Sequence, residues 1–472
     1  MRSYQITAVV VSLLFGWPVG GRAASLAYTY VSIADITQPD PSGLTVAGPS
    51  INSAGGVAFL FSPGAPADDR IFTGNGGPLT TITTSKLGDT RPSINDAGQV
   101  SFTRMLQLAG FGKGVFTGNG GSLTTIASDS SSFFGGDTSI NNAGAVAFFA
   151  EPVGGPGIFV GAGGPITTIA DTSGRFSGFA DGAPINNGGT VAFVAVLPGG
   201  SGIFTGSGGP TTTIADTSGP FTFFNNPSLN DAGIVSFVAG LARGGRGIFT
   251  GDGTTITMIA DPDGPFRNFF VSSINNGGLV AFQAGLDAPG EQGIYTGPDP
   301  LADKVIATGD PLFGSTVRDV VFGPKGLNDS GQIAFVAGLT DRRVVVVRAD
   351  PEQVLNAELS GTPDPATFAF DPTPVEDGPA GTFSFSAAFC NIGAKQLMLL
   401  KSVTTTLTGG NVLLNRDDGT PPRTGSKHSF PATLGFADGV LSAGECVDVP
   451  YQIGLATNAP FEFMVDGVGA AR

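Results

Sequence analysis

Histidine, cysteine and charge are all scarce in this chain of 472 residues. It has one histidine, His428, and two cysteines, Cys390 and Cys446, and charged residues make up 13% of it, about half of their usual share. One histidine cannot supply an HExxH motif or a zinc site built from several His and Cys ligands. A Ser-His-Asp triad is excluded from residues 28–350, which contain no histidine. His428 stands in a stretch rich in Gly, Pro and Ser, where we expect a surface residue. The GxSxG and GxxxxGK[ST] motifs are also absent.

Basic residues are fewer than acidic ones, 23 against 38, which gives a net charge of −15. Such a chain is poorly suited to bind nucleic acid or an anionic membrane. In place of charge there are 74 glycines, 34 prolines and 37 phenylalanines. Glycine and proline disfavour helices, while the phenylalanines supply apolar area for a core. The composition therefore excludes a coiled coil and a helix-rich enzyme.

Residues 1–27 have the pattern of a secretory signal peptide. Arg2 precedes an apolar run from Ile6 to Trp17, and small residues follow as far as Ala27. The alternative, an uncleaved membrane anchor, needs about 20 apolar residues, and this run is shorter. We therefore expect a secreted, cell-surface or periplasmic protein, with no membrane span in the mature chain.

A motif of the form Asn-x-x-Gly-x-Val-Ala-Phe, with conservative variations, occurs seven times between Ile51 and Phe335. Its Asn residues are 43, 46, 45, 44, 45 and 53 residues apart, which is the signature of a tandem-repeat fold. The positions that we expect to be structural are Asn52, Gly55, Phe59, Asn95, Gly98, Phe102, Asn141, Gly144, Phe148, Asn186, Gly189, Phe193, Asn230, Gly233, Phe237, Asn275, Gly278, Phe282, Asn328, Gly331 and Phe335.

Each copy of the motif predicts a β-hairpin. Asn side chains bind nearby backbone groups in tight turns, and Gly accepts the positive φ that closes them. The residues after Gly alternate, so Val and Phe lie on one face of a strand and Ala or Ser on the other. A strand with large side chains on one face and small side chains on the other suits a sheet that is packed closely between two neighbouring sheets.

Two more strand-like runs follow each hairpin, such as Ile71–Gly74 and Thr80–Ile82 in the first copy. With the stretch before each Asn, the unit has four short strands in about 45 residues, the size of a propeller blade. We therefore predict a seven-bladed β-propeller over residues 28–350. Residues 28–34 resemble the outer strands of other units, and no outer strand follows Val344–Val347, so we predict that the N-terminal strand completes the last blade.

The repeated Asn-x-x-Gly-x-Val-Ala-Phe motif resembles that of bacterial exported tandem-repeat proteins named for an NxxGxxAF motif and described as "choice-of-anchor" proteins. The resemblance covers about residues 28–350 and rests on seven matches. It implies export, and members often carry a C-terminal surface-sorting signal, which we do not find before Arg472. It implies no activity.

Residues 351–472 do not repeat, and their strand-like runs are separated by Gly, Pro and Asp. We predict an immunoglobulin-like β-sandwich there, after a stiff linker that contains Pro363 and Pro365. In an exported protein two cysteines favour a disulfide, here Cys390–Cys446, which would close a loop of 56 residues. The alternative is two buried free thiols.

Two sets of charged residues are candidate functional sites. An Asp ends the outer strand in several units, at Asp35, Asp129, Asp171, Asp216 and Asp261. These carboxylates could bind calcium. Because the Asp recurs at the same place in each of these units, we prefer the interpretation that it caps the turn to the next blade, and we expect no cofactor. Arg104, Arg243 and Arg246 interrupt the repeat in links on the same side of the ring. They form a candidate binding rim for an acidic glycan or a protein carboxylate.

We accordingly expect a monomeric, exported, non-enzymatic protein that serves as a cell-surface or extracellular scaffold or in adhesion. The alternative is a propeller that binds a carbohydrate or a protein through one rim. A glycosidase-type propeller is disfavoured, because such an enzyme needs carboxylates or Arg residues that converge on the central channel. The stretches before the Asn residues, such as Pro49-Ser50 and Pro92-Ser93, are small and uncharged.

Overall fold

The computed structural model describes residues 28–471 except 37–44, 47, 64–67, 87, 107–112, 130–132, 135, 153, 287–289, 302, 418–419, 421, 432–435 and 437–438. The described residues form strands, turns and loops and no helix, and thus contain no helix that could span a membrane. The chain divides into two compact units between Pro351 and Glu352. Both are all-β, as the sequence predicts. The predicted signal peptide, residues 1–27, lies outside the described residues.

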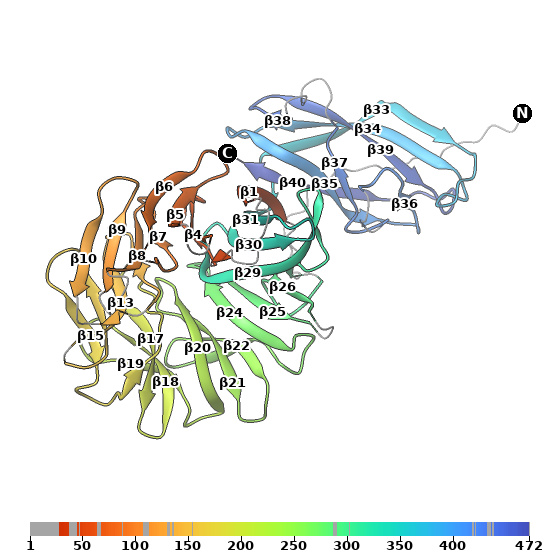
Figure 1. Ribbon diagram of the computed structural model, residues 1–472. Helices are drawn as coiled ribbons and strands as arrows, with labels where there is room; N and C mark the ends of the chain where they lie inside the picture. Colours follow the sequence, from red (N-terminus) through yellow and green to blue (C-terminus); the bar gives the residue numbers. More distant parts are fainter. Residues whose placement is uncertain are drawn as a thin grey trace, which may run out of the picture. The chain divides into compact units, whose positions relative to one another are not determined.

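Seven antiparallel sheets form the first unit, within the residues described there. They follow one another around a ring, from red to teal in Figure 1, and each sheet is one blade of a β-propeller. The first three blades contain β2 (Thr45–Val46), β3 (Ser50–Ile51), β4 (Val57–Ser62), β5 (Asp69–Gly74) and β6 (Thr80–Ser85); β7 (Ser93–Ile94), β8 (Val100–Met105), β9 (Lys113–Gly118) and β10 (Thr124–Asp129); and β11 (Phe133–Phe134), β12 (Ser139–Ile140), β13 (Val146–Glu151), β14 (Gly157–Gly161) and β15 (Thr167–Asp171).

The remaining four blades have the same plan. They contain β16 (Gly178–Phe179), β17 (Val191–Leu197), β18 (Gly200–Gly206) and β19 (Thr212–Asp216); β20 (Phe221–Leu229), β21 (Val235–Leu241), β22 (Arg246–Gly251) and β23 (Ile256–Ala260); β24 (Asn268–Ile274), β25 (Val280–Gly285), β26 (Gln292–Tyr295) and β27 (Lys304–Ala307); and β28 (Pro311–Leu312), β29 (Ser315–Leu327), β30 (Ile333–Leu339), β31 (Val344–Pro351) and β1 (Tyr28–Ile36).

The repeated motif forms the predicted hairpin turn between the inner strand and the second strand of each blade. In the fourth copy, the Gly189 N–H donates to the Asn186 carbonyl at 3.0 Å, and the Asn186 Oδ1 accepts from the Thr190 N–H at 2.9 Å. The motif glycines all have the positive φ that such a turn requires: Gly55, Gly98, Gly144, Gly189, Gly233, Gly278 and Gly331.

The motif Asn side chains also join the blades to one another. Each Nδ2 donates to the carbonyl of the next motif Asn, at distances of 2.9 to 3.2 Å, in the cyclic order Asn52, Asn95, Asn141, Asn186, Asn230, Asn275, Asn328 and back to Asn52. These side chains are buried. The repeat therefore specifies the turn and the contact between blades with the same residue.

Phenylalanine fills the space between blades. In the first six blades the motif Phe is paired in register with an aromatic residue of the third strand, as in Phe193 and Phe204, whose ring centroids lie 5.9 Å apart, and in the seventh its partner is Val347. Both rings are fully buried, together with Val191 on the same face, and on the other face Ala192 and Val194 are buried against the next blade. Aromatic pairs of this kind add about 0.5–1.5 kcal/mol to the stabilisation from burial.

The N-terminal strand closes the ring as predicted. β1 pairs antiparallel with β31, from Tyr28 opposite Pro351 to Ile36 opposite Val344, and the two lie side by side in Figure 1. Ile33 packs into a cluster that joins the last blade to the first. Arg348 adds a second link, because its buried guanidinium pairs with Asp350 and donates to the Gly55 carbonyl of the first blade at 2.9 Å.

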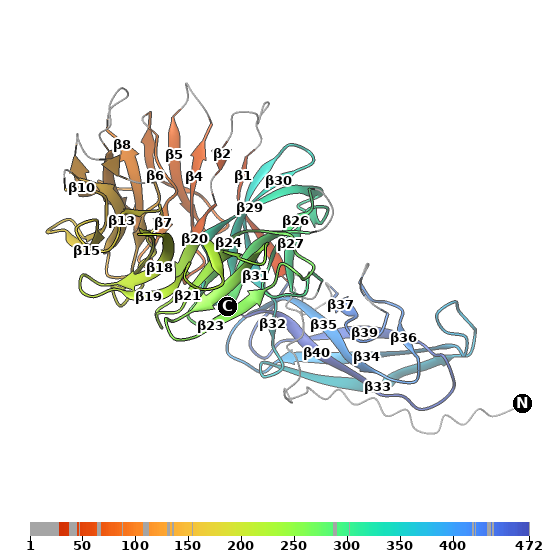
Figure 2. The same ribbon diagram turned by 90° about the horizontal axis from the view of Figure 1, so that it is seen from below.

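The second unit is a sandwich of two antiparallel sheets, drawn in blue in Figure 2. One sheet contains β32 (Gln353–Val354), β40 (Phe463–Ala471), β35 (Leu397–Leu407), β37 (Lys427–Ser429) and β38 (Val440–Leu441), and the other β33 (Leu359–Asp371), β34 (Thr382–Asn391), β39 (Cys446–Gly454) and β36 (Val412–Leu413). Apolar residues of both sheets form one core. The predicted Cys390–Cys446 disulfide is present, and it joins β34 to β39 within one sheet.

Two expectations for this unit were wrong. Pro363 and Pro365 lie within β33 rather than in a linker; Pro363 is opposite Ala387 of β34, and Pro365 lies where the pairing is interrupted, between Asp364 and Ala369. Proline is tolerated there because β33 is an edge strand, where one side of the backbone needs no partner. His428 is half-buried rather than a surface residue, and it lies against Tyr451, with 5.4 Å between ring centroids. Burial lowers the pKa of His428.

The turn geometry gives a test of the repeat. Gly189→Val places a β-branched residue at a φ of +81° and should lower the free energy of unfolding by about 1–3 kcal/mol, measured by urea denaturation. Gly209→Val is the matched control, because Gly209 has no positive φ and a Cβ there would meet open space. Gly199 is unsuitable, since its φ is +91° although it lies in a Gly/Pro-rich link. Equal losses at Gly189 and Gly209 would contradict the turn assignment.

Candidate binding site in the propeller channel

The inner strands surround a central channel, and a cavity of about 320 Å³ opens at the end where these strands begin. Its wall is built from the residues that precede the motif Asn in successive blades. Five of them are prolines, Pro49, Pro92, Pro184, Pro227 and Pro324, and three carry hydroxyl groups, Ser50, Thr138 and Ser139. Proline has a fixed φ and no backbone N–H, so it gives the cavity a stiff, mostly apolar wall.

Four charged residues line this cavity: Arg91, Asp137, Asp181 and Lys325. Two are cations and two are carboxylates, so their formal charges cancel. The Arg91 Nη1 lies 3.3 Å from the Asp137 Oδ2, and the Asp181 Oδ1 accepts a hydrogen bond from the Gly136 N–H at 3.2 Å. The cavity therefore presents fixed donors and acceptors, and it has no formal net charge when Lys325 is protonated.

Lys325 reaches across the channel. It belongs to β29 in the seventh blade, yet its Nζ donates to the Ser93 Oγ of the second blade at 2.7 Å and lies 3.5 Å from the Thr138 carbonyl oxygen of the third. Between Phe322 and Leu327 the pairing of β29 with β30 is interrupted. This bulge carries Lys325 out of the regular sheet and into the channel.

Burial changes the titration of two of these groups. The pKa of Lys325 falls to about 7, because burial disfavours the ammonium form more than the carboxylate of Asp137 favours it. The pKa of Asp137 is raised, also by burial, which outweighs the effects of Arg91 and Lys325. Near neutral pH the cavity thus contains an amine that is partly uncharged, a situation that burial can produce for Lys.

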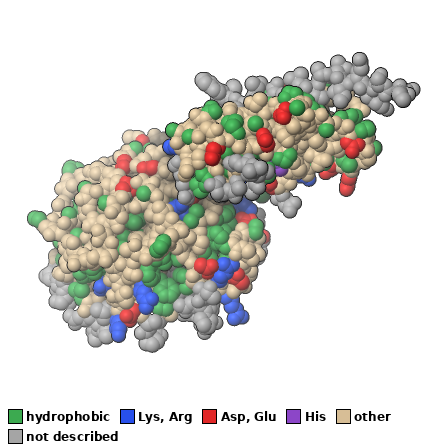
Figure 3. Space-filling model, turned by 90° about the horizontal axis from the view of Figure 1, so that it is seen from above, with side chains coloured by type: hydrophobic (Ala, Val, Ile, Leu, Met, Phe, Trp, Pro, Cys, Tyr) green, Lys and Arg blue, Asp and Glu red, His purple; other side chains and the backbone are tan. Residues whose placement is uncertain are grey.

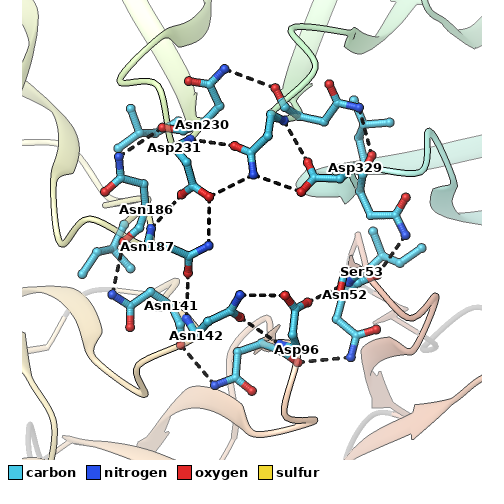
Figure 4. A pocket seen from close by; sticks show the side chains of 18 of the residues that line it. Asn52, Ser53, Asp96, Asn141, Asn142, Asn186, Asn187, Asn230, Asp231 and Asp329 are labelled. Atoms are coloured by element: carbon cyan, nitrogen blue, oxygen red, sulfur yellow. Dashed lines mark hydrogen bonds between the residues drawn. The ribbon is translucent and has the colours of Figure 1, made fainter.

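The other end of the channel is polar and acidic. It forms a shallower cavity of about 170 Å³ lined by the motif Asn residues and by the residues that follow them. Figure 4 shows Asp96, Asp231 and Asp329 around this opening with the amides of Asn142 and Asn187. Each carboxylate accepts hydrogen bonds from a neighbouring blade, for example Asp231 from the Asn187 N–H at 2.8 Å, so these residues link blades.

The arginines of the predicted binding rim contact acidic or aromatic side chains of the protein itself. Arg104 forms a salt bridge with Asp89, whose side chain is fully buried, with 2.7 Å between Nε and Oδ1. Arg243 pairs with Asp261 and Asp263, and the Arg246 guanidinium lies 5.1 Å from the centroid of the Phe223 ring. Figure 3 shows that charged side chains are sparse on the face that it displays. The structure does not bring the three arginines together around a cavity.

The Asp residues at the ends of outer strands cap turns, in agreement with the preferred interpretation. Asp171 accepts from the Ser173 N–H at 2.9 Å, Asp216 does the same with Ser218, and Asp261 with its neighbour two residues on. Asp35 instead pairs with Arg343 at 2.9 Å. The side chain of Asp129 lies outside the described residues. In the part of the chain that the structure describes, no group of three or more His, Cys, Asp or Glu residues is arranged to hold a metal ion.

A signal for the channel site was present in the sequence. The position three residues before the motif Asn is occupied by Pro49, Pro92, Thr138, Ala183, Pro227, Ser272 and Lys325. Lys325 alone is charged in this series. One position earlier, Arg91 and Asp137 occur where other copies have uncharged residues. Comparing the copies at the inner strand, rather than in the links, would have found the cavity.

Comparison with known proteins gives a family but no activity. The model of a family of unknown function (DUF7453) matches residues 71–378. No protein with a curated description matches the chain.

Several solved structures are similar. TolB from Acinetobacter baumannii has 15% sequence identity and a TM-score of 0.36 over 66% of this chain and 64% of TolB. An oligogalacturonate lyase from Vibrio parahaemolyticus has 12% identity and a TM-score of 0.44 over 69% of this chain and 98% of the lyase. A puromycin-hydrolyzing peptidase from Mycobacterium tuberculosis has 15% identity and a TM-score of 0.46, over 78% and 62% respectively. The chain spans 55% of a prolyl endopeptidase that also matches. Such distant similarities assign no function.

Proposed function

The chain belongs to DUF7453, a family of unknown function, and from the geometry of its channel we propose that it is an exported, non-enzymatic binding protein. Its propeller binds a small, uncharged polar ligand, such as a sugar unit of a glycan, in the cavity that contains Arg91, Asp137, Asp181 and Lys325. The observation that carries the proposal is the convergence of two cations and two carboxylates on one stiff-walled cavity.

The cavity suits an uncharged ligand for electrostatic reasons. Its four formal charges cancel when Lys325 is protonated and leave one negative charge when it is not, so the cavity does not attract an anion. A carboxylate accepts and a guanidinium donates hydrogen bonds, as sugar hydroxyls require. Its volume, about 320 Å³, lies at the lower end of the range for small-molecule sites, about 300–1,000 Å³. A purely structural scaffold needs no such cavity, so the binding alternative is favoured over the scaffold role. Export is supported by the disulfide.

We expect an array of neutral glycans to identify a ligand, and a double variant, Arg91→Ala with Asp137→Ala, to weaken its binding. Loss of hydrogen bonds to charged groups costs about 1.5–3 kcal/mol each, so Kd should rise at least about tenfold in calorimetry. Both residues are removed together because either one alone would leave a partly buried charge unpaired.

The matched control is Arg243→Ser with Arg246→Ser, which changes exposed arginines of the predicted rim. This variant should bind like the parent. If it loses binding while the cavity variant keeps it, the site is on the rim and the proposal is wrong. Arg104 is left unchanged, because removing it would leave the buried Asp89 carboxylate without its partner.

A further inference from the structure

The amine of Lys325 has a position that packing between blades does not explain. In the other six blades the equivalent residue is proline, alanine, serine or threonine, and these blades form the same inner strand and the same turn. The fold therefore does not need a lysine here. The interruption of the inner strand at this position is not specific to Lys325 either, because β20 is interrupted between Asn225 and Ser228, where the equivalent residue is Pro227.

We propose that Lys325 is a carbonyl-binding residue: its amine, held at the wall of the channel cavity, reacts reversibly with the aldehyde of a small ligand, such as the open-chain form of a reducing sugar, to give an imine. The proposal deepens the proposed function and rests on it, because it places the same ligand class in the same cavity.

The hydrogen bonds of Lys325 suit this role. A neutral amine has two N–H groups and one lone pair, whereas an ammonium has three N–H groups and none. Two acceptors lie within reach of the Nζ, the Ser93 Oγ at 2.7 Å and the Thr138 carbonyl oxygen at 3.5 Å. The neutral form can therefore satisfy both of its N–H groups and keep a lone pair for a ligand. The lowered pKa of Lys325 agrees with this count.

The cavity also contains a group that can transfer protons. In imine formation the nitrogen lone pair attacks the carbonyl carbon, and one proton passes from the nitrogen to the carbonyl oxygen to give a carbinolamine. The second proton of the nitrogen then passes to that hydroxyl, which leaves as water, so no oxidant or reductant is needed. Asp137 lines the same cavity and has a raised pKa, and a carboxyl group of this kind can give and take these protons. Arg91 and Asp181 are the other charged groups that face the cavity.

Reductive trapping tests the proposal on the full mature protein. The protein is treated briefly with glycolaldehyde and cyanoborohydride, which reduces an imine to a stable secondary amine, and the modified lysines are identified by peptide mass spectrometry. We expect Lys325 to be labelled at least tenfold faster than exposed lysines such as Lys86 and Lys395. Its labelling should level off above about pH 8, while that of exposed lysines continues to rise towards pH 10.

Two variants sharpen the test. Above about pH 8, where the Lys325 amine is neutral with or without the Asp137 carboxylate, Asp137→Asn should slow the labelling of Lys325 and leave that of Lys86 unchanged. A lysine that is merely reactive by chance would not be slowed. Lys325→Met should abolish the fast phase. A second probe, a reducing disaccharide, distinguishes two classes of aldehyde ligand. Labelling by both probes indicates that the ligand is the reducing end of a sugar, and labelling by glycolaldehyde alone indicates that it is a small free aldehyde.

The outcomes also separate the two proposals. If a glycan binds in the cavity but Lys325 is labelled no faster than Lys86, the carbonyl-binding role is wrong and the proposed function stands. If Lys325 is labelled fast but no glycan or other uncharged ligand binds, the proposed function is wrong, and only the reactivity of the Lys325 amine towards aldehydes is supported. Equal labelling of all lysines at every pH overturns the further inference.

Discussion

A chain that lacks residues 28–36 is expected to aggregate or to unfold far below the melting temperature of the parent. These residues form β1, whose removal leaves β31 with an unpaired, apolar edge from Val344 to Val347. An exposed edge of this kind promotes association with other chains. The first and last blades would also lose the contact made by Ile33. The measurement is the melting temperature and the monomer fraction by light scattering.

Point variants in β1 provide the matched control. Ile33 is buried and Ser32 is exposed. Ile33→Ala should destabilise the protein by about 2–5 kcal/mol, whereas Ser32→Ala should change the stability by less than about 0.5 kcal/mol. A soluble deletion variant with the melting temperature of the parent would refute closure of the ring by β1.

Asn186→Ala is expected to lower the free energy of unfolding by about 1–3 kcal/mol, because it leaves the Thr190 N–H without a partner. It also removes one of the two hydrogen bonds to the Asn230 carbonyl, which keeps the one from the Gly233 N–H at 3.1 Å. The Asn186 Oδ1 accepts from the Thr190 N–H at 2.9 Å, and its Nδ2 donates to the Asn230 carbonyl at 3.1 Å. The side chain is 6% exposed, so water cannot replace it. Urea denaturation measures the change.

The neighbouring residue is the control for this variant. Asn187 makes similar hydrogen bonds between blades, including one from its Nδ2 to Asp231 at 2.9 Å, but it is exposed. Water can take over these bonds, so Asn187→Ala should cost less than about 1 kcal/mol. Similar losses for the two variants would mean that the buried ring of Asn residues does not hold the blades together.

The propeller was predictable because each copy of the repeat forms the same turn and the same strand from residues that are close in the sequence. The turn depends on Asn and Gly three positions apart, and the strand that follows it depends on the alternation of Val, Ala and Phe, all of which lie within ten residues. The count of copies then gave the number of sheets, and the unmatched strand predicted at residues 28–34 indicated how the ring closes, which β1 does with residues 28–36. The disulfide followed from the number of cysteines and the predicted export.

The candidate site was less predictable because it depends on which side chains meet across the channel. Lys325 contacts Ser93 and Thr138, which are 232 and 187 residues away in the chain, and no local pattern encodes that approach. Arg104 and Arg243 stood out in the sequence as scarce cations, but the folded chain supplies each with a carboxylate. Deviation from the repeat was a useful signal, yet it did not distinguish a residue paired within the protein from one that lines a cavity.

The sequence by itself determined the all-β class, the repeated blade, the closure of the ring and the sandwich that follows, because these depend on turn chemistry and on alternation within short segments. The tertiary structure alone decided that two basic and two acidic residues share one cavity, that Lys325 crosses the channel, that Pro363 lies in an edge strand and that His428 is half-buried. Each of these depends on the burial and charge that distant segments impose on one another, and such effects exist only once the blades and the sheets have packed.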